Sequence, residues 1–232
     1  MSGHETTGVE PADKPMGYPR KRRQTQRRLL SAGMAVLAEQ GPGNVSAGQI
    51  ATAAGVATGT FYNHFSSVDV FIDAVAHDLG RAVEIGTDTL AAIEHDPAVR
   101  VSLGVLQLLD MADNDPVSAT AFVSLAAVRP EFRARVRALV GQAIADGVDD
   151  GCFEVASHQA AINAVLGATL QSMRSRVLGE TDHREAKPVA GLVLRLLGVP
   201  TRKIERTVDK ALRAIAEPAA DITAAGSATD GA

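Results

Sequence analysis

A glycine-centred segment near residue 60 collects side chains that can hydrogen-bond to nucleic acid. The amide of Asn63 can read an adenine edge, because it pairs a donor with an acceptor. Tyr62 and His64 carry donors on amphipathic rings, which suits phosphate oxygens beside a groove. Gly59 lacks a Cβ and would let backbone and DNA approach closely. The predicted DNA-contacting residues here are Ser46, Thr58, Gly59, Thr60, Tyr62, Asn63 and His64.

The local sequence around these residues predicts a helix, a tight turn and a second helix between Ser46 and Phe65. Ser46 is followed three residues later by Gln49, a capping-box pattern that starts a helix. Gly55 supplies the left-handed conformation that ends this helix, and Thr58 is predicted to open the next one. In a helix-turn-helix the second helix enters the major groove and the first lies across the phosphate backbone. Helix capping alone would also explain the hydroxyl residues, so both readings stay open.

The charge distribution separates a basic N-terminal part from an acidic remainder. Residues 14–66 hold seven Lys or Arg and one acidic residue, Glu39. Because the whole chain has a net charge of −4, the rest carries ten more negative than positive charges. This asymmetry is expected when one part of a protein meets phosphates. We predict a basic arm ahead of the first helix that follows the minor groove or phosphates, with a solvated charge run as the alternative. The arm consists of Arg20, Lys21, Arg22 and Arg23.

The turn and its flanks resemble the signature of the TetR family of repressors. The matching residues are Ile50-Ala51, Ala54-Gly55-Val56, Gly59-Thr60-Phe61-Tyr62 and His64-Phe65, within a likeness that covers about residues 28 to 75. The resemblance implies an all-α homodimer with an N-terminal domain that reads double-stranded operator DNA. It also implies a C-terminal core that binds a small-molecule effector and then releases the DNA.

Two positions depart from the family pattern. Val68 stands where the family usually has a lysine that contacts phosphate at the start of the fourth helix. Gly48 stands where some members carry an arginine that reads a base. We therefore expect one phosphate contact to be missing and base reading by the first helix of the motif to be weaker.

Helical periodicity and its punctuation predict an all-α fold, with a three-helix DNA-binding domain followed by a larger helical domain. Residues 1–19 and 218–232 are predicted to be disordered tails. The helix-turn-helix domain is assigned to residues 20–66 and the ligand-binding and dimerisation domain to residues 67–217. After a fourth helix from Ser66 to about residue 92, helices are predicted at about 97–112, 116–128, 130–147, 157–178, 184–198 and 201–216.

The larger domain is predicted to hold an apolar ligand pocket and a homodimer interface. For the pocket we select apolar residues of the middle helices, although core packing explains each equally well: Leu103, Leu106, Phe122, Val123, Leu170 and Met173. For the interface we select small residues that permit close helix approach and a neighbouring apolar stripe: Ala161, Ala164, Val165, Ala168, Val189, Leu192, Val193 and Leu196.

Other kinds of function leave no matching pattern. Cys152 is the single cysteine, which fits a reducing, cytoplasmic setting without disulfides. We find no metal-ligand spacing, cofactor motif or catalytic constellation, and no apolar run long enough to cross a membrane. The sequence therefore predicts a DNA-binding transcriptional regulator, a repressor released from a palindromic operator by a small apolar or amphipathic ligand. An activator or an effector-independent regulator is the alternative, and a small helical enzyme is a third reading.

Overall fold

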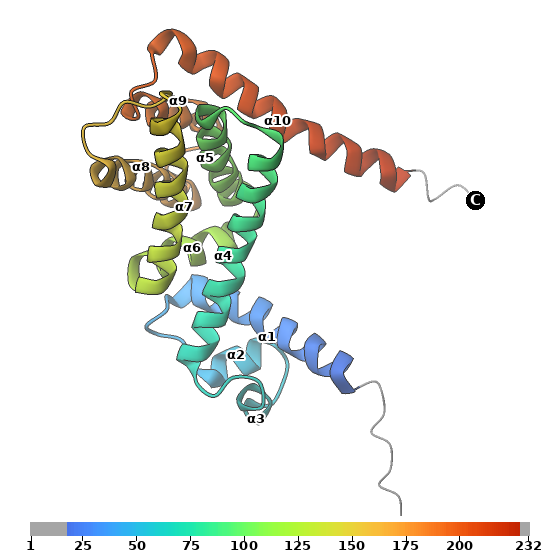
Figure 1. Ribbon diagram of the computed structural model, residues 1–232. Coiled ribbons are helices and arrows are strands. Elements are labelled where there is room, and N and C mark those ends of the chain that lie inside the picture. The colour runs from blue at the N-terminus through green and yellow to red at the C-terminus, as the bar shows by residue number, and fades with distance from the viewer. Residues whose placement is uncertain (1–17, 228–232) are drawn as a thin grey trace, which may run out of the picture.

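The protein is a stack of α-helices in which one long helix joins an N-terminal domain to a larger body (Figure 1). The computed structural model describes residues 18–227, apart from the side chains of residues 18–19, 87–88, 90–93 and 216–227. This part of the chain contains no β-strand, so the predicted all-α fold is confirmed. The helices are α1 (Tyr18–Gln40), α2 (Ala47–Ala53), α3 (Thr58–Tyr62), α4 (Val68–Ile93), α5 (Pro97–Asn114), α6 (Pro116–Val128), α7 (Pro130–Asp149), α8 (His158–Val177), the short 3-10 helix η1 (His183–Glu185), α9 (Ala186–Leu196) and α10 (Thr201–Ser227).

Three phenylalanines form the centre of the N-terminal domain. Phe61, Phe65 and Phe71 are at most 3% exposed. The ring of Phe71, on α4, lies 5.8 Å from that of Phe61 and 5.1 Å from that of Phe65. Gly33 on α1 makes room for this cluster, because a Cβ at that position would lie 2.2 Å from Cζ of Phe71. The start of α4 is therefore part of the core that holds α1, α2 and α3 together.

The larger body surrounds α5, which packs against α8, α9 and α10 as well as α6 and α7. Figure 1 shows α4 running from the N-terminal domain along this body, with α7 beside it. The N-terminal domain also reaches the body through α1, which packs against α6. The two domains thus share α4 and a second contact between α1 and α6.

Local signals fix where most helices begin. Ser46 and Gln49 form the predicted capping box, with both reciprocal hydrogen bonds present. Asp96 and Asp115 accept backbone hydrogen bonds at the starts of α5 and α6, each just before a proline in the first turn. Gly55 has a φ of +64°, the left-handed conformation predicted for the turn after α2.

Helix α3 begins at Thr58, as predicted, but its N-cap is Ala57, which makes no side-chain cap bond. The predicted start of α4 is wrong by one residue. The amide of Val70 donates to the hydroxyl of Ser67 at 3.2 Å, so Ser67 rather than Ser66 caps α4. A chain with adjacent serines offers two equivalent caps, and packing decides between them.

The two ends of the described chain are more helical than expected. Helix α1 already begins at Tyr18, so Arg20 to Arg23 lie within a helix and not in an extended arm. Helix α10 continues through Pro218 to Ser227, where the sequence predicted a tail. Proline removes one backbone donor, yet the backbone continues as a helix there. The predicted tail at residues 1–17 lies outside the described residues.

We expect Gly33→Ala to lower the free energy of unfolding by about 1–3 kcal/mol, because the new methyl group overlaps a ring that its neighbours hold in place. Urea denaturation measures the effect. Gly48→Ala is the matched control, since no atom lies within 4 Å of a Cβ at this helical position and alanine favours a helix over glycine. Equal stability of the two variants would contradict the packing described for α1 and α4.

Candidate DNA interface and ligand cavity

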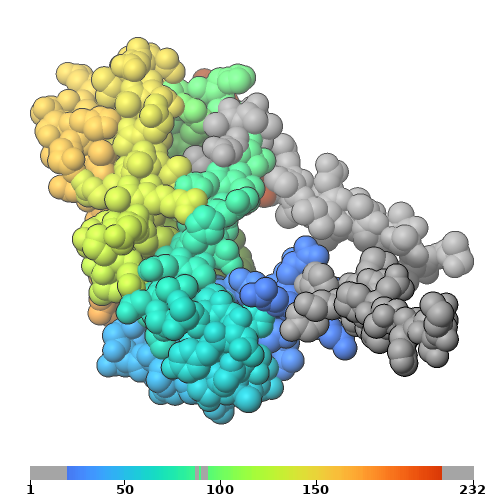
Figure 2. All heavy atoms as spheres, turned by 60° about the horizontal axis from the view of Figure 1, so that its bottom comes forward, coloured from blue at the N-terminus to red at the C-terminus, as the bar shows by residue number. Residues whose placement is uncertain are grey.

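The end of the molecule formed by α3 presents most of the predicted DNA-contacting residues to solvent. Tyr62 is 56% exposed, and Thr58, Gly59 and Asn63 are also exposed. Thr60 and His64 are half-buried. Figure 2 brings this end forward and shows residues near 50–75 as one rounded, protruding surface. The buried phenylalanines behind α3 turn its polar face outward.

Hydroxyl and amide groups on α3 are available for an external partner. Because Ala57 provides the N-cap, neither Thr58 nor Thr60 is used as a side-chain cap. In the described part of the chain, the side chains of Thr58, Thr60 and Asn63 make no hydrogen bond to the protein. Space is also open around Gly59, where a Cβ would meet no atom within 4 Å. The structural explanation by capping therefore does not apply to these two threonines.

Ser46 differs from the residues of α3, because its hydroxyl is engaged in the capping box. The hydroxyl donates to Oε1 of Gln49 at 2.7 Å and accepts from the backbone amide of Gln49 at 3.3 Å. Ser46 is nevertheless exposed. A contact of Ser46 with phosphate would require its hydroxyl to rotate away from Gln49, so capping is the role that the structure describes.

The basic run lies along the first turns of α1. Arg20, Lys21, Arg22 and Arg23 are exposed. The positive charge of Arg22 acts on the imidazole of His64 and lowers its pKa. A helical run cannot follow the minor groove as an extended arm does, so that part of the prediction is corrected. The same charges on a helix can face phosphates beside the groove.

The surroundings of His64 favour its neutral form and lower its pKa. Partial burial is the larger cause of its lowered pKa, because burial disfavours the charged imidazole, and the charge of Arg22 adds to the effect. A neutral imidazole still has one N–H that can donate to a phosphate oxygen. A phosphate at this position would favour the protonated form and raise the pKa again.

The start of α4 lacks the positive charge expected of a phosphate contact. Val68 is half-buried against the core. The neighbouring Asp69 accepts a hydrogen bond from Arg129 at 2.6 Å, and Arg129 also lies 3.6 Å from Asp73. The loop between α6 and α7 is thus bound to the start of α4.

A second set of ionic contacts holds α4 against α7. The guanidinium of Arg135 makes two hydrogen bonds to the carboxylate of Glu84, which lower the pKa of Glu84. Its Nη1 also lies 3.4 Å from Nδ1 of His77. With Arg129, these contacts fix α4 to the larger body along several turns.

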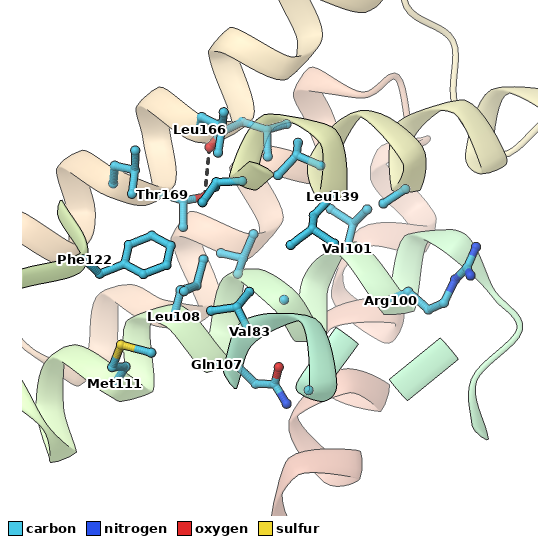
Figure 3. A pocket seen from close by; sticks show the side chains of 18 of the residues that line it. Val83, Arg100, Val101, Gln107, Leu108, Met111, Phe122, Leu139, Leu166 and Thr169 are labelled. Carbon is cyan, nitrogen blue, oxygen red and sulfur yellow. Dashed lines mark hydrogen bonds between the residues drawn. The ribbon is translucent and has the colours of Figure 1, made fainter. Parts of the chain in front are cut away.

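A mainly apolar cavity of about 270 Å³ lies between α4, α5, α6, α7 and α8 (Figure 3). Phe122 and Leu170 are among its lining residues, as the sequence analysis selected. Leu103, Leu106, Val123 and Met173 do not line it. The cavity has further lining residues on α4, α5, α7 and α8 that were not predicted, among them Ala82, Val83, Gly86, Val101, Gln107, Leu139 and Thr169.

The helical phase of α5 explains the wrong pocket residues. Val101 and Gly104 line the cavity. Leu103 comes two residues after Val101, and Leu106 comes two residues after Gly104. Two residues turn an α-helix by about 200°, so these leucines lie on the opposite side of α5. Both are at most 3% exposed. Since α5 is buried on nearly all sides, its apolar residues do not reveal which face borders the cavity.

The residues predicted for the dimer interface fall into two groups. Ala161, Val165 and Val193 are at most 7% exposed within one protomer, so they belong to its core and cannot form a partner surface. Leu192 and Leu196 are 49% and 45% exposed on α9. The other predicted residues are half-buried on α8 and α9: Ala164, Ala168 and Val189.

Among the residues that the structure describes, no three His, Cys, Asp or Glu side chains come together as metal ligands would. The same residues include no helix with the length and apolar character needed to cross a bilayer. Cys152 is half-buried, and its pKa is raised by burial and by the charges of Asp96 and Asp150.

Comparison with known proteins identifies the N-terminal domain. A family described as "Bacterial regulatory proteins, tetR family" matches residues 29–75. An uncharacterised HTH-type transcriptional regulator of Mycobacterium tuberculosis is 29% identical over 172 residues, which cover 68% of this chain and 79% of that protein. A second such regulator of the same species is 35% identical over 89 residues, which cover 38% of this chain and 46% of that protein.

Solved structures share the fold of most of the chain. The crystal structure of RolR in complex with the ligand resorcinol has a TM-score of 0.61 at 24% identity, and the match covers 82% of this chain and 95% of that chain. A gamma-butyrolactone receptor described as ArpA-like has a TM-score of 0.66 at 18% identity, with 83% and 97% covered. Both likenesses extend from the N-terminal domain into the larger body.

The fold and the exposed face of α3 define a helix-turn-helix DNA-binding transcriptional regulator. By its sequence, the N-terminal domain is of the tetR type, since the tetR family of bacterial regulatory proteins matches residues 29–75.

We expect DNA affinity to rise as the pH falls from 8 towards 5.5, with His64 as one source of the change. The pKa of His64 is below its ordinary value in the free protein, and a phosphate contact would raise it. When the pH is above the pKa of His64 in both the free protein and the DNA complex, the imidazole is neutral in both and contributes no pH dependence. When the pH lies between these two pKa values, DNA binding takes up a proton, so affinity increases by up to about tenfold for each unit that the pH falls.

Fluorescence anisotropy with a bound DNA duplex across this pH range measures the slope. His64→Gln is expected to flatten it, whereas His95→Gln, at an exposed residue before α5, is expected to leave it unchanged. The same slope in all three proteins would show that His64 does not meet a phosphate.

Proposed function

We propose that this protein is a homodimeric repressor that leaves its operator when a small molecule binds in the cavity of each protomer. One observation carries the proposal: α4 supplies Phe71 to the core of the DNA-binding domain and supplies Ala82, Val83 and Gly86 to the cavity wall. A ligand that changes the position of α4 therefore also changes the position of α3. RolR, which resembles this chain in fold, binds resorcinol, and the similar ArpA-like protein is a gamma-butyrolactone receptor, which supports the same reading.

In the DNA complex, α3 of each protomer is proposed to enter the major groove. Gly59 permits close approach, the amide of Asn63 and the hydroxyl of Thr60 read base edges, and Tyr62 and His64 bind phosphate. The helical basic run from Arg20 to Arg23 adds contacts to the backbone of the duplex. A two-fold symmetric dimer binds half-sites that are about 34 Å, or a multiple of it, apart. We place this action in the cytoplasm, on double-stranded DNA.

The dimer is proposed to form through the exposed side of α8 and α9. Leu192 and Leu196 provide apolar contact area, and Ala164 and Ala168 allow α8 to approach a partner helix closely. This surface retains part of the interface selected from the sequence and leaves out the three residues buried within the protomer.

Release follows from a difference in affinity between two arrangements of the dimer. A ligand releases the DNA only if it binds the arrangement that cannot bind DNA more tightly than the arrangement that can. A coupling of about 1–3 kcal/mol corresponds to a change in operator affinity of about 5-fold to 150-fold. Arg129 and Arg135, which tie α4 to α7, hold one of these arrangements in place.

We expect Tyr62→Phe to weaken binding to a DNA site selected from random sequences by about tenfold, because one hydrogen bond to a charged phosphate is lost. Asn63→Ala is expected to change the selected sequence itself, since Asn63 reads a base. Anisotropy titrations and repeated selection measure the two effects. Thermal unfolding of both variants should match that of the unaltered protein, since both side chains are exposed. If Tyr62→Phe binds DNA as tightly as the unaltered protein, Tyr62 does not contact a phosphate.

We expect Gly104→Leu to yield a protein that binds DNA normally and is no longer released by ligand. Gly104 lines the cavity, and a Cβ there would meet no atom within 4 Å, so the leucine side chain fills the space. The measurement is operator release in a screen of metabolites, with Gly104→Ala as the variant that leaves most of the cavity open. If compounds still release Gly104→Leu from DNA, they act elsewhere. If no compound releases the unaltered protein, an effector-independent regulator is the better description.

A further inference from the structure

The lining of the cavity restricts the chemistry of its ligand. Most of the lining side chains are aliphatic or aromatic, such as Val83, Phe122 and Leu139. Among the described lining residues, the polar side chains are those of Arg100, Gln107 and Thr169. Their bonding in the protein decides which of them is open to a ligand.

Arg100 does not offer an uncompensated positive charge. Its Nη2 lies 3.2 Å from Oδ2 of Asp146, and this carboxylate also accepts a hydrogen bond from Gln142 at 2.7 Å. Nε of Arg100 has no partner in the described part of the chain, yet it is fully buried and so faces packed protein rather than open space. An anionic ligand would have to compete with Asp146 for Arg100. A carboxylate left unpaired in an apolar cavity is strongly disfavoured.

Glu84, next to the lining residue Val83 on α4, is also paired, since the guanidinium of Arg135 binds it. Among its described lining residues, the cavity therefore presents no unpaired cation for a ligand carboxylate and no carboxylate for a ligand amine.

Gln107 is the polar group that remains open. The hydroxyl of Thr169 already donates to the carbonyl of Val165 at 2.8 Å and is almost fully buried. The amide of Gln107 is half-buried and makes no hydrogen bond to any described residue. Its Oε1 lies 3.5 Å from the position that a Cβ of Gly86 would occupy, so the amide lies next to α4. Figure 3 shows the side chain of Gln107 extending from α5 toward α4.

We infer that the effector is an uncharged, mainly apolar molecule whose hydroxyl or carbonyl group binds the amide of Gln107. This inference rests on the proposed function, because it assigns the ligand of the same cavity. A cavity of 270 Å³ corresponds to about nine waters of liquid volume, and so to a ligand of about ten non-hydrogen atoms. A polar group held by Gln107 sits beside Gly86, which places the bound ligand against the helix that reaches the DNA-binding domain.

Calorimetric titration of the full-length protein with three related probes tests the inference. The probes are 4-butylphenol, which is uncharged and has a hydroxyl group, butylbenzene, which has no polar group, and 4-butylbenzoate, which is an anion. We expect 4-butylphenol to bind about threefold to tenfold more tightly than butylbenzene, the value of one neutral hydrogen bond. We expect 4-butylbenzoate to bind at least about a hundredfold more weakly than 4-butylphenol.

Gln107→Leu removes the amide and keeps the size of the side chain. In this variant 4-butylphenol and butylbenzene should bind equally, and butylbenzene should bind no more weakly than to the unaltered protein. Gln159→Leu makes the same change at an exposed residue of α8 and should preserve the preference for the phenol. Gln107→Met serves in place of Gln107→Leu if the latter does not fold by circular dichroism.

The inference is overturned if the benzoate binds as tightly as the phenol, if the phenol keeps its advantage in Gln107→Leu, or if none of the probes binds. Release from DNA is measured separately by anisotropy. Selective binding of the phenol without release would contradict the proposed induction and leave the assignment of the ligand class standing. Release by the benzoate alone would contradict the ligand class and support induction.

Discussion

The contact of Phe71 with Phe61 and Phe65 holds the DNA-reading helix to the rest of the molecule. Helix α3 has five residues, far fewer than an isolated helix needs to be stable in water. Its shape and direction therefore come from tertiary packing, and Phe71 of α4 is at the centre of that packing. Gly33 allows α1 to approach this cluster. The outward direction of Tyr62 and Asn63 follows, because the opposite face of α3 is fixed inside the core.

The same helix gives the protein a route from cavity to DNA. Helix α4 has 26 residues and spans about 39 Å at 1.5 Å per residue, so its two ends lie in different environments. At one end it completes an aromatic core, and near the other its small residues border the cavity. The ionic contacts of Arg129 and Arg135 with α4 add discrete links to α7. A packed helix with such links changes position between defined arrangements rather than bending continuously.

Local sequence signals predicted the fold well, because they act over a few residues. Prolines at the starts of α5, α6 and α7 and the glycine after α2 mark helix ends whatever the tertiary structure is. The exposed face of α3 was predictable for the same reason, since Phe61 and Phe65 have helical spacing and mark the buried side. Adjacent serines before α4 and the basic run before Leu29 offered no such unique signal, and there the predicted boundaries failed.

The cavity and the dimer surface were harder to predict, because they depend on which face of a buried helix meets which neighbour. In α6, apolar residues occur on every side, so periodicity contains little information about direction. In α8 and α9, small and apolar residues serve both the protomer core and the exposed side, as Val193 and Leu192 show at neighbouring positions. Gln107 carries no sequence signal at all, since its isolation among apolar neighbours is visible only in three dimensions.

The position of α3 in the DNA complex can be measured directly by methylation protection of guanine N7, an atom that lies in the major groove. The account predicts that the protein, on a DNA site selected from random sequences, protects guanines in two major-groove segments related by two-fold symmetry. Their centres should be about 34 Å or a multiple of it apart on the duplex. Protection of a single segment, or of adenine N3 in the minor groove alone, would contradict the reading of DNA by paired α3 helices.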